Sequence, residues 1–331
     1  MSTNSDDVEL QTSMEKIIQR RHYEYFDTWI NNFVLNLEDI WREPSAKILE
    51  PNLEKDSNFL NSSAIVIGRG PSLKKKKHLE LLANSNYRGM IIACDGILIE
   101  ALKSGVTPDK FPNFYVVTID YAPTFKKFYD DELVDKFGKK IKGIFTTITD
   151  PDVVERARRA GIKIHWIHPL FDYNEGKKSF NYITSKMVRV KKREMGLPAI
   201  QTGGNVGTTA WFISWLILKC KTVSLIGINH AWEESDGWEK IITHNNDLPI
   251  KMEKTDPVFN KLFEKGHNPG FNCDFVLDPM FRLYSMCLKE FIVRSPDWVN
   301  TINATEGGSI FGDRITCKNF KQFLADEESN P

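Results

Sequence analysis

The sequence predicts an α/β protein, and two observations carry this prediction. Short apolar runs rich in β-branched residues alternate with helical segments between residues 64 and 302. Glycine-rich turns stand where strands should pass into helices, at residues 68–70 and 202–207. Such alternation is typical of a doubly wound, mainly parallel, Rossmann-like sheet, here preceded by an N-terminal helical extension.

Composition narrows the class of protein. The 331 residues are 41% hydrophobic and 27% charged, as in soluble globular proteins. Lys+Arg and Asp+Glu both number 44, which argues against nucleic acid as a partner. The longest apolar run, residues 210–218, is far shorter than the roughly 20 residues of a membrane span. Five cysteines without a Cys-x-x-Cys pair and an acidic, polar N-terminus predict reduced thiols and a cytoplasmic location.

Three segments are expected along the chain. Residues 1–60 form the helical extension, residues 61–315 the Rossmann-like catalytic domain, and residues 316–331 a C-terminal helix and tail. Apolar and aromatic side chains recur at helical spacing over residues 14–41, which predicts one long helix or two. These helices pack either on the main domain or on a second copy of the chain, forming a homo-oligomer.

In the first half of the domain, strands and helices alternate. We expect a helix to begin at Pro71, and the polar, basic residues 172–200 to form a solvated loop or the stem of a mobile lid. The expected strands are 64–67, 90–94, 114–119, 143–147 and 163–167, and the other expected helices are 97–104 and 151–160.

In the second half, a glycine-rich turn opens an almost wholly apolar helix that ends near residue 218. Residues 233–274 show no clear periodicity and are expected to be a substrate-binding insertion or disordered. The other expected elements are strands at 222–228 and 299–302, helices at 279–294 and 318–324, and a third polar glycine turn at 303–310.

The first glycine turn reads Gly-Arg-Gly-Pro-Ser-Leu from residue 68. Gly68 and Gly70 permit a sharp turn and a close approach of a ligand, and Pro71 suits the first turn of a helix. Together with Ser72 they are predicted to bind a nucleotide phosphate at a helix N-terminus, the alternative being a plain tight turn. Because Leu73 replaces the third glycine and no Gly-Lys-Ser/Thr follows, neither the dinucleotide fingerprint nor the ATPase phosphate loop is present.

Two aspartates stand at predicted strand ends. Asp95 follows the strand 90–94, and Asp120 follows the strand 114–119. Ligands of such sheets bind outside the carboxyl ends of the strands, and carboxylates are ligands that Mg²⁺ prefers. We predict Asp95 as a nucleotide-binding and Mg²⁺ residue and Asp120 as a catalytic and Mg²⁺ residue, the alternative for each being a helix cap.

Other candidates come from the second and third turns. Thr202, Gly203, Gly204 and Asn205 are predicted to bind the nucleotide or substrate through backbone and amide groups. The catalytic candidates there are His230, a general base or a structural histidine, and Glu306, a carboxylate between glycine turns.

The three turns together resemble a known family. Segments 68–73, 202–207 and 303–308 resemble, in this order and separation, the archaeal MptE-like family, 6-hydroxymethyl-7,8-dihydropterin diphosphokinases. Related patterns occur in the Maf motility-associated glycosyltransferase-like proteins and in a family of bacterial sialyltransferases. The resemblance covers about residues 64–312. One departure is Asn229, where relatives commonly carry aspartate, which weakens a metal or base role at that position.

The resemblance implies two chemistries. An MptE-like enzyme transfers diphosphate from ATP to a dihydropterin alcohol with Mg²⁺, for which Asp95, Asp120 and Glu306 are available. A Maf-like or sialyltransferase-like enzyme uses a CMP-activated sugar, needs no metal, and would use His230 as its base. We expect the first, with a small-molecule acceptor that the sequence does not identify. The alternatives are the glycosyltransferase and a non-catalytic nucleotide-binding assembly protein.

Overall fold

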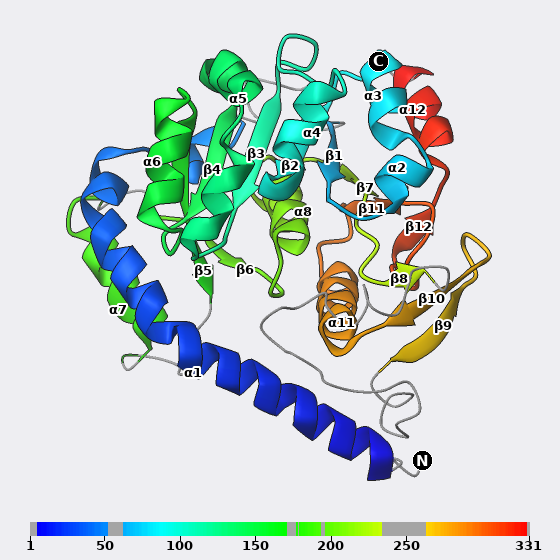
Figure 1. Cartoon of the computed structure of the whole chain (residues 1–331), viewed down its shortest axis with the longest axis horizontal. Helices are drawn as coiled ribbons and strands as arrows, with labels where there is room; N and C mark the ends of the chain where they lie inside the picture. The colour runs from blue at the N-terminus through cyan, green and yellow to red at the C-terminus, as the bar shows by residue number, and fades with distance from the viewer. Residues whose placement is uncertain are drawn as a thin grey trace.

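The centre of the protein is a parallel sheet. The computed structural model describes residues 5–51, 62–170, 177, 179–192, 196–233 and 263–329, with side chains from residue 24 onward. Within these residues a nine-stranded sheet has the order β12-β11-β7-β1-β2-β3-β4-β5-β6, and all of its neighbouring strands pair in parallel (Figure 1). The doubly wound, Rossmann-like α/β fold is therefore confirmed. The strands are β1 Ser63–Ile67, β2 Met90–Cys94, β3 Phe114–Thr118, β4 Lys142–Thr146, β5 Lys163–Leu170, β6 Ala199–Gln201, β7 Thr222–Ile226, β11 Asn300–Asn303 and β12 Ile315–Cys317.

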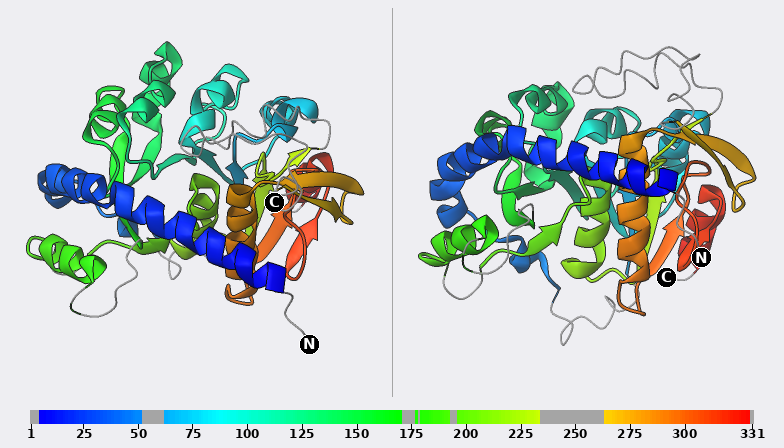
Figure 2. Two further views of the ribbon diagram at one scale, coloured as in Figure 1. Left: turned by 60° about the horizontal axis from the view of Figure 1, so that its bottom comes forward. Right: turned by 90° about the horizontal axis from the view of Figure 1, so that it is seen from below.

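Helices cover both faces of this sheet. Every residue of β1, β2 and β3 is buried, as parallel strands between two helical layers require. Ile65 and Ile67 of β1 face one hydrophobic layer, whereas Ala64 and Val66 face the other. Figure 2 shows these layers on opposite sides of the sheet. The first holds α3 His78–Asn84, α4 Leu98–Lys103 and α6 Pro151–Arg159, and the second holds α8 Val206–Leu216 and α11 Pro279–Val293.

The strand order creates one switch point that matters for function. From β1 the chain builds outward to β6, and α8 then carries it back to β7 on the opposite side of β1. Connections therefore diverge at the carboxyl ends of β1 and β7. In open α/β sheets this is where ligands bind.

The segment after the first glycine turn differs from the expected single helix. It forms two short helices, α2 Ser72–Lys75 and α3, separated by Lys77 in the left-handed conformation with φ 54°. Pro71 precedes α2 as its N-cap rather than beginning a longer helix. The four residues of α2 are too few for an appreciable helix dipole.

Two stretches expected to be irregular contain regular structure. Within 172–200, helix α7 Phe180–Arg189 and strand β6 replace the expected loop. Within 233–274, β9 Glu264–Asn268 and β10 Cys273–Leu277 pair with β8 Trp232–Glu233 in an antiparallel sheet, while residues 234–262 lie outside the described part. The polar, exposed sequence of β9 gives no period-2 signal, because its strand character comes from cross-strand pairing.

Further elements complete the chain. The 3-10 helix η4 Pro123–Phe128 and helix α5 Glu132–Phe137 follow β3, and α12 Phe320–Ser329 follows β12. Phe320 and Phe323 of α12 are buried in the same core layer as α3. All five cysteines lie in the described part and are free thiols. Among the described residues no helix has the length and apolar content of a membrane span.

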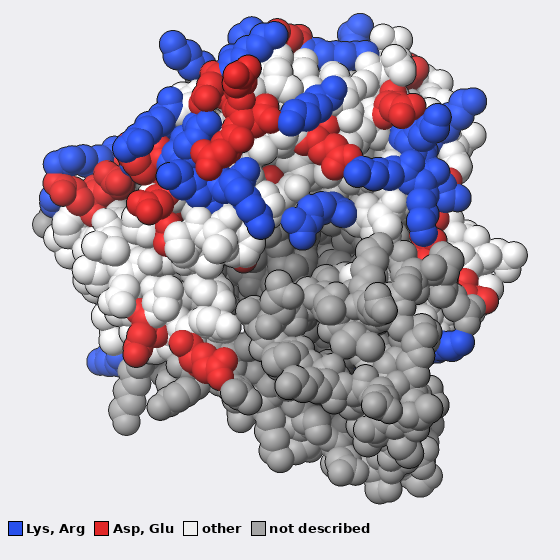
Figure 3. Space-filling model, viewed as in Figure 1, with Lys and Arg blue, Asp and Glu red and all other residues white. Residues whose placement is uncertain are grey.

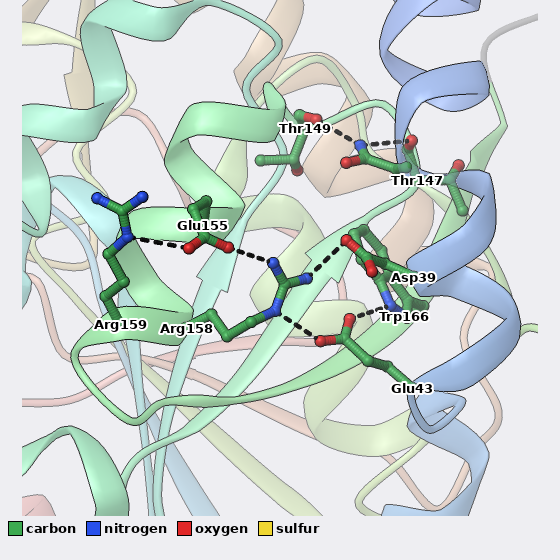
Figure 4. A network of polar contacts seen from close by, with 9 residues as sticks. Asp39, Glu43, Thr147, Thr149, Glu155, Arg158, Arg159 and Trp166 are labelled. Atoms are coloured by element: carbon green, nitrogen blue, oxygen red, sulfur yellow. Dashed lines mark hydrogen bonds and ion pairs between the residues drawn. The ribbon is translucent and has the colours of Figure 1, made fainter.

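The N-terminal extension is one helix, α1 Ser5–Arg42, whose C-terminal half is fastened to the body. Asn36 Nδ2 donates to the backbone oxygens of Thr147 and Thr149, at 3.3 and 2.7 Å. Arg158 of α6 forms ion pairs with Asp39 of α1 and with Glu43 just after it, both at 2.9 Å, and Figure 4 shows this network. The N-terminal half continues past α7 in Figures 1 and 2. Helix α1 is therefore anchored at the loops that follow the central strands.

Removing the Asn36 amide should destabilise the protein. Asn36 is only 2% exposed, so Asn36→Ala leaves two buried carbonyls without this donor. We expect the free energy of unfolding to fall by about 1–3 kcal/mol in urea denaturation. Glu38→Ala, on the exposed face of α1, removes only a surface pair with Arg42 and should cost less than about 0.5 kcal/mol. Equal stabilities of the two variants would contradict the anchoring role of Asn36.

Candidate functional site

Candidate residues from four strands gather at the carboxyl edge of the sheet. The first glycine turn follows β1, Asp95 follows β2, Asp120 follows β3, and Asn229 and His230 follow β7. The second turn reaches the same place. Ile228 Cδ1 lies 2.3 Å from where a Cβ on Gly68 would be and 2.7 Å from where one on Gly207 would be. The start of α8 and the turn after β1 are therefore neighbours.

Gly68 and Gly70 are required by the close approach of β7. Gly68 N–H donates to the oxygen of Ile226 at 2.9 Å, and Gly70 N–H donates to that of Gly227 at 2.8 Å. A Cβ on Gly70 would lie 2.0 Å from Asn229 Oδ1. These two N–H groups are therefore already used in hydrogen bonds to the backbone at the end of β7. Nucleotide binding at this turn stays a prediction and needs other donors.

Asn229 joins the first and third glycine turns. The Ser72 hydroxyl donates to Asn229 Oδ1 at 3.0 Å, and Ser309 N–H donates to the Asn229 backbone oxygen at 2.9 Å. A Cβ on Gly308 would lie 2.2 Å from that oxygen. The Ser72 side chain is buried and serves this contact. Asn229 therefore holds the turns together, a role for which an amide suffices.

Asp95 and Asp120 form a carboxylate pair with raised pKa values. Asp95 is 3% exposed; its Oδ1 accepts the Gly96 N–H at 2.7 Å, and its Oδ2 has no hydrogen-bond partner among the described residues. Burial, and next the charge of Asp120, raise the pKa of Asp95 to about 8. Burial raises the pKa of Asp120 to about 6, against the opposing effect of Arg69. Both carboxylates thus lack a full counter-charge.

This pair fits a divalent cation that is also bound by phosphate. A bound cation would give Asp95 Oδ2 a partner and would relieve the repulsion between the two carboxylates. The described residues contain no group of three or more His, Cys, Asp or Glu able to hold a metal. Mg²⁺ characteristically uses one or two carboxylates and completes its shell with water and substrate phosphates. Asp95 and Asp120 suit that mode and not a site formed by protein ligands alone.

The second glycine turn is built around the cap of α8. Gly203 and Gly204 adopt φ of 56° and 79°, and Gly204 N–H donates to Thr202 Oγ1 at 3.2 Å. Asn205 Oδ1 accepts the Thr208 N–H at 2.8 Å as the N-cap. The Asn205 side chain is thus engaged within the turn. In the described structure the amides of Val206 and Gly207 are left at the start of this eleven-residue helix, where an anion is favoured.

His230 is poorly suited to be a base. Its ring is buried near Phe281 and Tyr284 of α11, with centroids 6.4 and 5.8 Å away. Burial, and next the charge of Lys289, lower the pKa of His230 to about 3. A general base works best with a pKa near the operating pH, so the structure favours the structural alternative for His230.

Glu306 is engaged with the C-terminal helix. Its carboxylate accepts Asn319 Nδ2 at 2.7 Å and Phe320 N–H at 3.2 Å, and contacts His78 Nε2 at 3.3 Å. These contacts anchor α12 to the turn after β11. Among the described residues, Asp120 is the one catalytic candidate of the three with a carboxylate that lacks a full counter-charge, and it lies at the carboxyl edge of the sheet beside the switch point.

Comparison with known proteins places the chain in a family. Residues 31–235 match the sequence model of the family described as 6-hydroxymethylpterin diphosphokinase MptE-like. The chain belongs to the MptE-like family. The matched range contains the first two glycine turns and Asn229, whereas the third turn, at 303–308, lies beyond it.

A solved structure shares the fold. The "MAf glycosyltransferase from Magnetospirillum magneticum AMB-1" is similar with a TM-score of 0.53 and 14% identity, over 81% of this chain and 36% of that one. The chain thus spans about a third of the glycosyltransferase, and the likeness shows the fold alone. No curated protein sequence matches the chain. The names of the MptE-like family and of this structure are both names of transferases.

The structure adds one residue to the site of this MptE-like chain that the sequence analysis missed. Arg69 is exposed, and its side chain passes over Gly96, where a Cβ would lie 3.3 Å from Arg69 Cδ. Its guanidinium lies 5.5 Å from the centre of the Phe128 ring. The available signal was its position as the one side chain between two glycines of the turn.

Proposed function

We propose that the protein is a nucleotide-dependent transferase that moves diphosphate from ATP to a hydroxymethyl-dihydropterin-type alcohol with Mg²⁺. The observation that carries this proposal is the pair of carboxylates, buried Asp95 and half-buried Asp120, at the carboxyl edge beside the β1–β7 switch point. Membership of the MptE-like family supports the reaction class.

Different residues would bind the cation, bind the phosphates and take the proton of the acceptor. Asp95 and Asp120 would hold Mg²⁺, which would neutralise charge on the phosphates. The amides at the start of α8 would bind phosphate oxygens. Asp120, at the same edge of the sheet, would accept the proton of the attacking hydroxyl. The alcohol oxygen bonds to the β-phosphorus, the bond from that phosphorus to the bridging oxygen of AMP breaks, and AMP leaves.

One observation favours a second candidate. The solved structure that shares this fold is named as a glycosyltransferase, which makes a sugar transfer without metal the alternative. Transfer of a sugar from a CMP-activated donor is such a reaction, and the fold is one that a glycosyltransferase uses. With the pKa of His230 near 3, Asp120 would serve as the base there too. Activity that survives EDTA would favour this candidate.

Thermal shift separates the two donors. A ligand at about a hundred times its Kd adds roughly 2.7 kcal/mol to the free energy of unfolding. We expect the melting temperature to rise with ATP plus Mg²⁺, and to rise much less with ATP plus EDTA or with CMP. Stabilisation by CMP or CTP regardless of Mg²⁺, with none by Mg²⁺-ATP, would replace the diphosphokinase proposal with the glycosyltransferase.

A further inference from the structure

Two backbone donors of the first glycine turn are already engaged. The N–H groups of Gly68 and Gly70 donate to the backbone oxygens of Ile226 and Gly227 at the end of β7. The Ser72 hydroxyl is buried against Asn229. A phosphate held by this turn therefore needs other donors, and Arg69 is the charged side chain of the turn.

Arg69 is the side chain that the turn directs toward the carboxylate pair. Its Cδ and Nη1 lie 3.3 and 3.5 Å from where a Cβ on Gly96 would be, beside Asp95. Its charge opposes the raised pKa of both Asp95 and Asp120. The hydrogen bonds of Gly68 and Gly70 to β7 flank it and fix its backbone.

The Arg69 charge is available to a ligand. Within the described part of the chain no hydrogen bond or ion pair of 4.0 Å or less engages the guanidinium, so neither Asp95 nor Asp120 neutralises it. Its contact is the Phe128 ring, and Lys127 Nζ lies 5.5 Å from the same ring centre. An aromatic face holds a guanidinium without occupying its N–H donors.

Lys and Arg side chains, interspersed with Asp and Glu, gather over the upper part of the face that Figure 3 displays. Cations gathered on a surface attract anionic ligands. Arginine binds phosphate oxygens through two parallel N–H bonds, which an ammonium group cannot do.

We propose that Arg69 is the donor-binding and specificity-determining residue of the site, its guanidinium binding the terminal phosphates of a polyphosphate donor. This inference rests on the proposed function. The Phe128 ring positions the Arg69 side chain, and the guanidinium would supply positive charge that the engaged N–H groups of Gly68 and Gly70 do not. Selection of a di- or triphosphate over a monophosphate follows from two charged groups, cation and guanidinium, spaced along the chain of phosphates.

Calorimetric titration with inorganic pyrophosphate and Mg²⁺ tests the inference without turnover. We expect Arg69→Ala to weaken pyrophosphate binding about 10-fold or more. Arg69→Lys should weaken it less, because lysine keeps the positive charge but lacks the paired N–H donors of the guanidinium. Lys136→Ala is the matched control, since Lys136 also lies over a phenylalanine, Phe137, at 5.0 Å. Lys136 belongs to α5, outside the site, so its removal should leave binding unchanged.

A double-mutant cycle with Gly96 tests the geometry. A Cβ at Gly96 would lie only 3.3 Å from Arg69 Cδ and displace this side chain, so Gly96→Ala should weaken pyrophosphate binding several-fold in the wild-type background. In the Arg69→Ala background the same substitution should change nothing further, because contacting residues couple. Equal losses in both backgrounds would show that Gly96→Ala acts independently of Arg69 and would overturn the geometric argument.

The outcomes separate this inference from the proposed function. If wild-type protein binds pyrophosphate and both Arg69 variants bind it equally well, the inference is overturned while the diphosphokinase proposal stands. If wild-type protein binds neither pyrophosphate nor Mg²⁺-ATP, both fall together. Because Arg69 is exposed, its variants should keep the wild-type melting temperature, which confirms that a loss of binding is not a loss of folding.

Discussion

Replacing Asp120 with asparagine is expected to lower kcat by about 10²–10⁴-fold. Asparagine keeps the size of the side chain but removes the group that would accept the acceptor's proton and help hold Mg²⁺. With its pKa raised to about 6 by burial, Asp120 is ionised at neutral pH yet basic enough to take a proton. The measurement is the rate of AMP formation from ATP and a hydroxymethyl-dihydropterin.

A carboxylate elsewhere provides the control for this prediction. Asp109 is exposed and paired with Lys140, so Asp109→Asn should leave kcat unchanged. Asp120→Asn should remain folded, because it removes a carboxylate whose ionised form burial disfavours. A kcat within a few-fold of wild type would remove both the catalytic and the metal assignment of Asp120.

Replacing Asp95 with asparagine is expected to abolish the loss of stability that Asp95 causes as the pH rises from about 4 to about 8. The pKa of Asp95 is about 8 in the folded protein, above its ordinary value of 3.8. Between these values the folded state binds more protons than the unfolded state, so the free energy of unfolding decreases as pH rises. Each unit of pKa shift corresponds to about 1.4 kcal/mol. Asp95→Asn abolishes this loss and should be more stable than wild type near pH 8.5.

Melting curves between pH 5 and 9, with and without Mg²⁺, measure this effect. Mg²⁺ should stabilise wild-type protein more at pH 8.5 than at pH 5.5, because protons compete for the carboxylates, and should not stabilise Asp95→Asn. Asp131 is a control of opposite sign, since its hydrogen bond with Lys103 lowers its pKa. Asp131→Asn should therefore be less stable than wild type at neutral pH, and this difference should vanish as the pH falls and Asp131 is protonated. Parallel pH profiles for wild type and Asp95→Asn would contradict the burial argument.

Local sequence signals account for the correct part of the fold prediction. Strands β1 to β5 are apolar or β-branched runs bounded by polar residues, and each was expected within a few residues of its position. The prediction was wrong where the signal is not local. Strand β9, with the sequence Glu-Lys-Gly-His-Asn, is held by pairing with β10. Helix α2 ends at Lys75, although the lysines that follow are good helix formers.

The candidate site shows the same difference between local and non-local sequence signals. Asp95 and Asp120 could be predicted because they directly follow buried strands, whose carboxyl ends must share an edge. The roles of His230 and Glu306 could not, since they depend on α11 and α12, whose contacts come from distant parts of the chain. Arg69 was missed because its neighbours Gly96 and Phe128 are far from it in sequence.

The sequence alone determined the doubly wound sheet, its carboxyl edge and the three glycine turns, because period, strand ends and glycine steric freedom are properties of short segments. Only the tertiary structure decided which donors remain for a ligand. The glycine turn looks like a phosphate site until β7 lies beside it and accepts its N–H groups. Hydrogen-bonding capacity is local, whereas its use depends on every neighbour that folding brings near.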